Sequence, residues 1–262
     1  MAECIHGLDD GLCDICFPKE QPLNPVPGTV RSGAKRRTAG SSAVREKATR
    51  SARTPEGKPL PPFGQRRIHH VTHLRNLETI LFDGAITAGA DPELDLLAEE
   101  ARAKRRQTEV IHGTSVAEFI SFSLSPNAIW WDEVLTGATD DRWSASAKSS
   151  PGTQYVQLVG TVATAGTDVA ASDEDAMSPT ARFGLGVDAA GTLVRRAALD
   201  DPELRRPEVL VRGRYRTSDL VLLAVPNEPV RDKVKAMLRE HKGASPRIVV
   251  YPPWFQPIPI ED

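Results

Sequence analysis

The amino-acid sequence predicts an α+β fold, in which a few helices flank one mixed or split β-sheet. Short apolar runs of strand length alternate with amphipathic stretches of helix length, and the last of these stretches lies between two strands as a crossover. This pattern begins only near residue 65. Because a chain of 262 residues with 40% hydrophobic content can bury one sizeable core, we expect one folded domain over residues 65–262.

Residues 19–64 have the composition of a tether rather than of a domain. Eight prolines occur from Pro18 to Pro62, and ten Lys or Arg residues stand against two glutamates from Gly28 to Arg66, although the net charge of the whole chain is −2. Low hydrophobicity and frequent X-Pro steps predict disorder. This basic Pro-rich linker either attracts polyanions by counterion release or only adds solubility.

Residues 1–18 contain a candidate zinc knuckle. All three cysteines of the chain and one histidine are spaced there as C-x-H-x6-C-x2-C. A tetrahedral structural zinc takes four such ligands, and a segment so short and so poor in apolar residues needs a metal to become ordered. The alternative is a disordered tail with free thiols. The predicted ligands of one structural zinc are Cys4, His6, Cys13 and Cys16.

The chain shows no feature of a membrane or secreted protein. No run approaches the roughly 18 consecutive apolar residues of a membrane helix, and the N-terminus lacks the basic-then-apolar order of a signal peptide. Three cysteines within so short a segment fit neither a disulfide framework nor a secreted domain. We therefore expect a cytoplasmic protein without a membrane partner.

The folded domain opens with a strand that turns directly into a helix. Residues 68–71 predict the strand, apolar residues recur at helical spacing from Leu74 to Leu81, and Gly84 stands where a left-handed residue ends many helices. Three histidines and Asn76 crowd the junction. Backbone N–H groups, the positive helix end and these side chains can therefore converge on one polar or anionic ligand.

Residues 91–106 predict a helix that ends in Lys104, Arg105 and Arg106. Cations at a helix C-terminus stabilise it through the helix dipole; the alternative is that one arginine binds a pyrophosphate or a nucleic-acid backbone. Residues 119–124 predict a strand, and residues 127–133 predict a short helix with two adjacent tryptophans, Trp130 and Trp131. Such tryptophans usually pack in the core, and the alternative is that they stack on bases.

The second half of the domain begins with a polar loop over residues 137–152 and an alternating strand over residues 155–162. Residues 168–191 have no firm period and predict loop with some helix. Residues 205–211 predict a strand with Glu208 at its start. A lone glutamate beside a Val-Leu-Val run is most often a surface residue, so this pattern by itself does not mark a catalytic group.

The C-terminal part predicts the crossover. Residues 220–225 form a buried strand, Asn227 caps a helix with an early proline, Gly243 ends that helix, and residues 247–251 return as a strand.

Three motifs follow one another over roughly residues 65–255. They are the opening "RIHHVTHLRNLETILFDG", the later "RRPEVLV" and the closing "DLVLLAV…NEPVRDKVKAMLREH…RIVVYPPWF". In this combination the chain resembles the DarT family of ADP-ribosyltransferase toxins. The resemblance implies an ADP-ribosyltransferase-like split mixed sheet and NAD as a substrate. It also implies mono-ADP-ribosylation of a base of single-stranded DNA, a role in a toxin-antitoxin or phage-defence system, and a macrodomain antitoxin that reverses the mark.

The opening motif of the family, His-x-Thr-His-x-x-Asn-Leu, corresponds to residues 70–77. The resemblance implies that its polar members hold the adenosine and nicotinamide-ribose side of NAD. These polar members are His70, Thr72, His73 and Asn76, and Leu77 completes the motif.

The resemblance also implies the catalytic groups. The arginine that follows the early helices of the family corresponds to Arg105 or Arg106, near the pyrophosphate and the base, and the glutamate of its late motif corresponds to Glu208. This carboxylate is expected to orient the acceptor and to stabilise the oxocarbenium-like charge that develops as nicotinamide departs.

The chain departs from the family pattern in three places. Residues 123–131 replace an Asn-Pro-Arg-Ser-Pro-like run, and Pro207 rather than alanine precedes the glutamate. The basic linker and its Cys/His segment lie outside the minimal domain of the family. Thymine, guanine, an RNA base and a protein side chain therefore stay open as acceptors. The alternative from a different class is a non-enzymatic, zinc-containing nucleic-acid-binding module, which predicts that His70, the arginines and Glu208 lie far apart.

Overall fold

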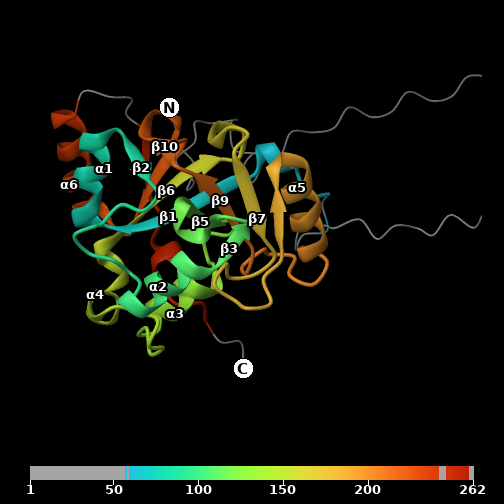
Figure 1. Ribbon diagram of the computed structural model, residues 1–262. Coiled ribbons are helices and arrows are strands. Elements are labelled where there is room, and N and C mark those ends of the chain that lie inside the picture. The colour runs from blue at the N-terminus through green and yellow to red at the C-terminus, as the bar shows by residue number, and fades with distance from the viewer. Residues whose placement is uncertain (1–56, 58, 242–245, 260–262) are drawn as a thin grey trace, which may run out of the picture. The chain divides into compact units, whose positions relative to one another are not determined.

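An eight-stranded mixed β-sheet organises the residues that the computed structural model describes, which are residue 57 and residues 59–241 and 246–259 (Figure 1). Only β11 and β12 pair in parallel, and the other neighbouring strands of this sheet are antiparallel. In spatial order the strands are β12 (Arg247–Val250), β11 (Leu222–Val225), β6 (Tyr155–Thr161), β1 (Arg67–His73), β5 (Phe119–Ser123), β9 (Glu208–Arg212), β7 (Val169–Ser172) and β8 (Phe183–Leu185).

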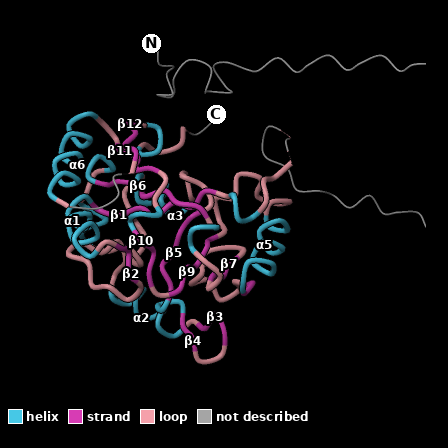
Figure 2. Tube along the Cα trace, turned by 90° about the horizontal axis from the view of Figure 1, so that it is seen from above, coloured by secondary structure: helices cyan, strands magenta, loops and turns pink. Residues whose placement is uncertain are grey.

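Helices cover both faces of the sheet, and two short ribbons lie beside it. Figures 1 and 2 both place α1 and α6 side by side near one edge of the sheet and α5 near the opposite edge. The helices are α1 (Leu74–Asp83), α2 (Glu99–Gln107), α3 (Ile129–Leu135), α4 (Ala145–Ser149), α5 (Gly186–Ala197) and α6 (Glu228–Glu240). The ribbons pair β2 (Ala85–Thr87) with β10 (Arg214–Arg216), and β3 (Glu109–Ile111) with β4 (Thr114–Ser115). Single 3₁₀ turns are η1 (Phe63–Gln65), η2 (Val116–Glu118), η3 (Gly152–Gln154), η4 (Ala163–Ala165), η5 (Thr217–Asp219) and η6 (Pro252–Phe255).

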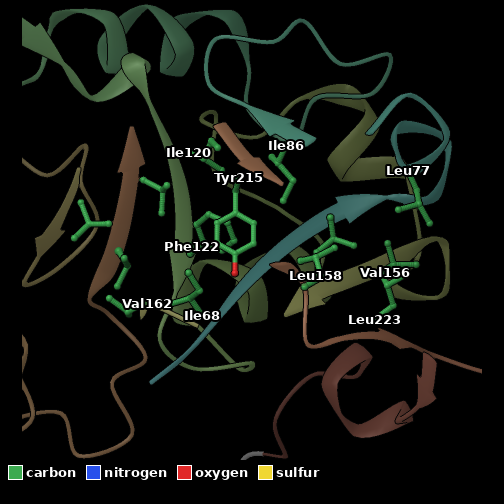
Figure 3. Packing of buried hydrophobic residues seen from close by; sticks show 14 of the residues in the cluster. Ile68, Leu77, Ile86, Ile120, Phe122, Val156, Leu158, Val162, Tyr215 and Leu223 are labelled. Atoms are coloured by element: carbon green, nitrogen blue, oxygen red, sulfur yellow. The ribbon is translucent and has the colours of Figure 1, made fainter. Parts of the chain in front are cut away.

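The two faces of the sheet bury separate apolar clusters. Successive side chains of a strand point to opposite faces, so Ile68 joins the cluster that α1, α5 and α6 cover, whereas Val71 joins the one that α3 and α4 cover. Figure 3 shows Tyr215 in the middle of the first cluster, near Phe122. Gly160 of β6 permits this packing, because a Cβ atom there would lie only 1.9 Å from the Tyr215 hydroxyl oxygen.

The opening strand and helix form as the sequence predicts. The Nδ1 atom of His73 accepts a hydrogen bond from the Arg75 backbone N–H at 3.2 Å and caps α1, and Gly84 ends that helix with φ 67°. The strand extends beyond the predicted residues 68–71 because all seven residues of β1 pair with β6. The predicted strands near residues 119, 155, 205, 220 and 247 and the C-terminal helix are also present.

Three predicted segments are wrong in part. The helix predicted over residues 91–106 begins only at Glu99, because the Asn76 side chain bonds both the N–H and the carbonyl of Leu94 and holds that backbone in an irregular path. The polar loop over residues 137–152 contains α4, which Ser144 caps. The segment 168–191, predicted as loop with some helix, contains the start of α5 as its helical part, but it also contains the unpredicted strands β7 and β8. Every residue of β7 is buried, so its sequence shows no alternation of apolar and polar residues. Two of its residues are alanines, which have low β-propensity, so the sequence did not predict this strand.

Several predictions fall on residues outside the described part of the chain. These are the zinc ligands Cys4, His6, Cys13 and Cys16 and nearly all of the basic linker, so the boundaries of both segments stay predictions. Within the described residues, no helix is long and apolar enough to cross a membrane. The predicted cytoplasmic location stays a prediction as well.

Candidate active site

A cavity of about 320 Å³ lies where the sheet splits between its two central strands. β1 and β5 pair through one register pair, His69 and Ser123, and then diverge. An antiparallel continuation of that pairing would set residues 70–73 opposite residues 119–122. Residues 70–73 and 119–121 instead line the cavity, and residues 85–97 form a further side of it.

Glu208 is a buried acid that lines the cavity. It is the first residue of β9, its side chain is buried, and the whole residue is only 5% exposed. Burial and the nearby negative charge of Asp175 raise the pKa of Glu208 to about 7, although the Arg105 charge and hydrogen bonds from the Ser121 hydroxyl and the Ala176 N–H oppose the rise. The Oε2 atom is buried and has no hydrogen-bond partner among the described residues. The carboxylate is therefore desolvated and only partly satisfied by the protein groups around it.

Arg105 and Glu208 are joined through Ser121. The Nη2 atom of Arg105 donates to the Ser121 Oγ atom at 2.8 Å, and that hydroxyl in turn donates to the Glu208 carboxylate. Arg106 points elsewhere: it pairs with Glu99 at 2.6 Å, and its side chain is 54% exposed. Of the two candidate arginines, Arg105 lines the cavity and Arg106 does not.

His70 lines the same cavity, and the hydrogen bond of its ring is made by Nδ1. A carbonyl oxygen can only accept, so the contact of 3.1 Å between Nδ1 and the Ser121 carbonyl places the proton on Nδ1. Burial and the charge of Arg105 lower the pKa of His70, although its hydrogen bond to Ser121 favours the charged form. The neutral ring keeps Nε2 as an acceptor.

The other members of the opening motif line the cavity with polar groups that the protein already uses. Both ring nitrogens of His73 are engaged, since Nδ1 caps α1 and Nε2 donates to the Gln154 side chain at 3.1 Å. The Asn76 Nδ2 group donates to the Leu94 carbonyl at 2.7 Å and to Thr72 Oγ1 at 3.3 Å, and its Oδ1 atom accepts from Leu94 N–H at 3.0 Å. These residues hold the wall of the cavity in shape.

Ser121, Asp175, Arg142 and Trp143 also line the cavity and were not among the predicted site residues. The available signal for Ser121 was that it is one of two serines in a strand whose other residues are apolar. The other three lie on irregular segments without any period. The two tryptophans of α3 separate: Trp131 is fully buried in the core, whereas Trp130 lines the cavity and donates from Nε1 to Ser123 at 2.9 Å.

The convergence of His70, Arg105 and Glu208 in one cavity contradicts the alternative of a non-enzymatic binding module, which requires them to lie far apart. A family model described as "ssDNA thymidine ADP-ribosyltransferase, DarT" matches residues 69–256. The chain belongs to the DarT family. It is an NAD-dependent ADP-ribosyltransferase that acts on a base of single-stranded DNA, as the resemblance of its motifs implied.

Solved DarT structures share the fold of the chain. Thermus sp. 2.9 DarT in complex with ADP-ribosylated ssDNA is 19% identical with a TM-score of 0.62, and the match covers 78% of this chain and 99% of that chain. The same protein in complex with NAD+ is 20% identical with a TM-score of 0.59, with 75% and 98% covered. Thermosipho africanus DarTG in complex with ADP-ribose is 14% identical with a TM-score of 0.55, with 72% and 51% covered. None of the curated proteins matches the chain. These structures confirm the predicted α+β fold.

Proposed function

We propose that the cavity holds NAD and that the acceptor is a thymidine base of single-stranded DNA, with Glu208 as the catalytic carboxylate. The observation that carries the proposal is the arrangement around Glu208. Ser121 and Ala176 donate hydrogen bonds to its buried carboxylate, the Oε2 atom of that carboxylate has no partner among the described residues, and Arg105 lies on the far side of Ser121. The family description supports thymidine as the acceptor, and the Thermus DarT structures with NAD+ and with ADP-ribosylated ssDNA support the ligands.

The residues have complementary roles in the transfer. As the bond between nicotinamide and the ribose breaks, its electron pair leaves with nicotinamide and positive charge develops on the anomeric carbon. The Glu208 carboxylate stabilises that charge, a nitrogen of the base forms the new bond to the same carbon, and the proton that this nitrogen loses passes to Glu208. A carboxyl group with a pKa of about 7 can both stabilise a cation and accept a proton near neutral pH.

The remaining predicted residues position NAD. Arg105 binds the pyrophosphate as a fixed cation, and His70 accepts a ribose hydroxyl at Nε2. The side chains of Thr72, His73 and Asn76 shape the surface against which the nucleotide lies. Arg106 pairs with Glu99 on the outside of α2 and takes no part.

The experiment that tests this function is mass spectrometry of single-stranded oligonucleotides, each with one kind of base, after incubation with NAD and either the wild type or Glu208→Gln. We expect an adduct of one ADP-ribose on the thymidine oligonucleotide with the wild type, and none with the variant. Glu118→Gln is the matched control, because Glu118 pairs with Arg212 on the surface beside the same strands and should leave the adduct unchanged. An adduct on guanine, on RNA or on protein instead would replace thymidine as the acceptor.

We also propose that a macrodomain antitoxin removes the mark. Support comes from membership of the family and from the solved Thermosipho africanus DarTG in complex with ADP-ribose. Expression of the wild type should stop bacterial growth, and co-expression of a macrodomain hydrolase that removes ADP-ribose from DNA should restore growth. The Glu208→Gln variant should be harmless without that hydrolase. If the wild type arrests growth equally with and without it, the antitoxin is of another kind.

One structural zinc on Cys4, His6, Cys13 and Cys16 completes the proposal. The donor set and spacing of these residues support it. Metal analysis of purified full-length protein should give about one equivalent of zinc. The double variant Cys13→Ser, Cys16→Ser should lose the metal. Protein that is free of metal when purified without chelators would count against the site.

A further inference from the structure

Arg142 links two acidic side chains from separate parts of the domain. It lies in the irregular segment between α3 and α4, where it pairs with Glu133 of α3 and, at 2.5 Å, with Asp175 of the loop after β7. Its guanidinium carbon lies 4.4 Å from the centre of the Trp143 ring. Although burial opposes its charge, the hydrogen bond with Glu133 and the charge of Asp175 raise the pKa of Arg142. Arg142 is thus a fixed, permanently charged bridge.

Asp175 connects this bridge to Glu208. Its Oδ1 atom accepts from the Met177 N–H at 2.8 Å, and its carbonyl accepts from the Ser178 N–H at 2.8 Å. These two bonds close a turn over residues 175–178, and the Ala176 N–H of that turn donates to the Glu208 carboxylate. Any shift of Asp175 therefore moves a donor that holds Glu208.

Arg142 also compensates the negative charge that lies beside Glu208. The groups that face this carboxylate are Arg105 from α2, Ser121 from β5, and Asp175 and the Ala176 N–H from the loop after β7. His70 of β1 shares the cavity as a neutral ring. Asp175 is the one negatively charged neighbour among these groups, and Arg142 is paired with it directly.

We propose that Arg142 is a positioning residue for the transfer reaction: through its ion pair with Asp175 it fixes the turn that holds Glu208 and balances the one negative charge beside it. This inference rests on the proposed role of Glu208. It assigns a function to the irregular segment between α3 and α4, which contributes no group to the reacting atoms themselves. Loss of Arg142 should leave Asp175 uncompensated, so that Glu208 binds its proton more tightly.

The test is the pH dependence of ADP-ribose transfer from NAD to the thymidine oligonucleotide, with NAD hydrolysis as a second readout. We expect Arg142→Gln to lower the rate about tenfold at neutral pH and to move the acidic limb of the profile upward by about one pH unit. Asp175→Asn keeps the Oδ1 acceptor for Met177 but removes the charge, so it should move the limb downward. Asp175→Asn added to Arg142→Gln should reverse the upward shift.

Two further variants keep the test decisive. Arg142→Lys keeps the charge but loses the paired geometry, so it should keep the limb near its wild-type position while the rate falls by a smaller factor than in Arg142→Gln. Arg182→Gln is the matched control: Arg182 pairs with Asp173 on the same loop at 2.6 Å but does not line the cavity, and its loss should leave the limb in place. If Arg142→Gln does not fold, Arg142→Lys and Asp175→Asn decide the matter.

The possible failures are distinguishable. A uniform fall in rate for Arg142→Gln with no movement of the limb, or no shift in Asp175→Asn, would overturn the inference while Glu208→Gln remains inactive. Wild-type transfer by Glu208→Gln would overturn the proposed role of Glu208 itself, and the inference with it.

Discussion

The polar side chains on the two walls of the cavity differ in how completely the protein hydrogen-bonds them. On the strand-helix wall, formed by β1 and α1, the protein itself binds the polar groups of Thr72, His73 and Asn76. On the acid wall, formed by α2, β5, β9 and the turn after β7, the buried Oε2 atom of Glu208 has no hydrogen-bond partner in the described part of the chain. A buried acceptor without a hydrogen bond is costly, so the acid wall contains an unsatisfied buried group, whereas on the strand-helix wall the protein satisfies these three side chains and leaves Nε2 of His70 as an acceptor.

The largest expected effect is on the rate of transfer, and it distinguishes the two arginines of α2, of which only Arg105 belongs to the acid wall. Arg105→Gln removes the donor to Ser121 and the cation that we propose binds the pyrophosphate, so transfer should fall roughly 10²-fold, as for other lost charge-stabilising donors. Arg106→Gln removes only a surface pair with Glu99 and should change the rate less than twofold, which is close to the limit of ±0.5 kcal/mol for surface changes.

Rates of transfer at saturating NAD and oligonucleotide measure this difference. Arg106→Gln serves as the internal control for Arg105→Gln, since both side chains leave the same helix turn. Equal losses in the two variants would show that the charge of the helix end, rather than one side chain in the cavity, supports the reaction.

The sequence predicts the strand-helix wall far better than the acid wall. Local rules determine the first wall: the spacing of apolar residues, the cap at His73 and the left-handed Gly84 all lie within a few residues of one another. The acid wall depends on contacts between distant parts of the chain: Arg105 and Ser121 are 16 residues apart, and Arg142 and Asp175 are 33 residues apart. No periodicity signals such a contact.

The site residues illustrate the same limit. Glu208 beside a Val-Leu-Val run carries no pattern of its own, and only the resemblance of the surrounding motifs marked it. Asn76 was expected to hold NAD directly, and in the structure its amide holds the backbone of Leu94. Whether NAD also contacts Asn76 stays a prediction. A motif identifies the residues of a site, but their division between ligand and scaffold depends on tertiary contacts.

The second prediction concerns whether the buried carboxylate of the acid wall lowers the free energy of unfolding. Burial raises the pKa of Glu208 from 4.5 to about 7, so the folded state binds this proton more strongly than the unfolded state. The carboxylate therefore lowers stability progressively as pH rises from about 4.5 to 7. Glu208→Gln should raise the free energy of unfolding on the order of 3 kcal/mol above pH 7, and by little near pH 4.5.

Urea unfolding of the ligand-free wild type and Glu208→Gln at pH 5 and pH 8 measures this difference. A gain in stability at pH 8 that disappears at pH 5 would confirm that activity is retained at the expense of stability. If the variant is less stable than the wild type at both values, the hydrogen bonds from Ser121 and Ala176 outweigh desolvation, and the acid wall is no more strained than the strand-helix wall.

The third and smallest effect concerns Asn76 on the strand-helix wall. Asn76→Ala removes three hydrogen bonds and leaves the N–H and carbonyl of Leu94 without their partner, which should lower the free energy of unfolding by about 2 kcal/mol. Because residues 91–97 line the cavity, their loosening should weaken NAD binding by roughly 1 kcal/mol, about fivefold in KM. The kcat should change little, since scaffold contacts are the same in the ground state and in the transition state.

Asn227→Ala provides the contrast for Asn76→Ala. Asn227 caps α6 by accepting from the Val230 N–H at 3.0 Å and does not line the cavity. Its loss should cost about 1 kcal/mol of stability and leave the KM for NAD unchanged. A fall in kcat for Asn76→Ala without loss of stability would mean that the amide contacts the reacting part of NAD. The strand-helix wall would then share the chemistry that the structure otherwise concentrates around Glu208.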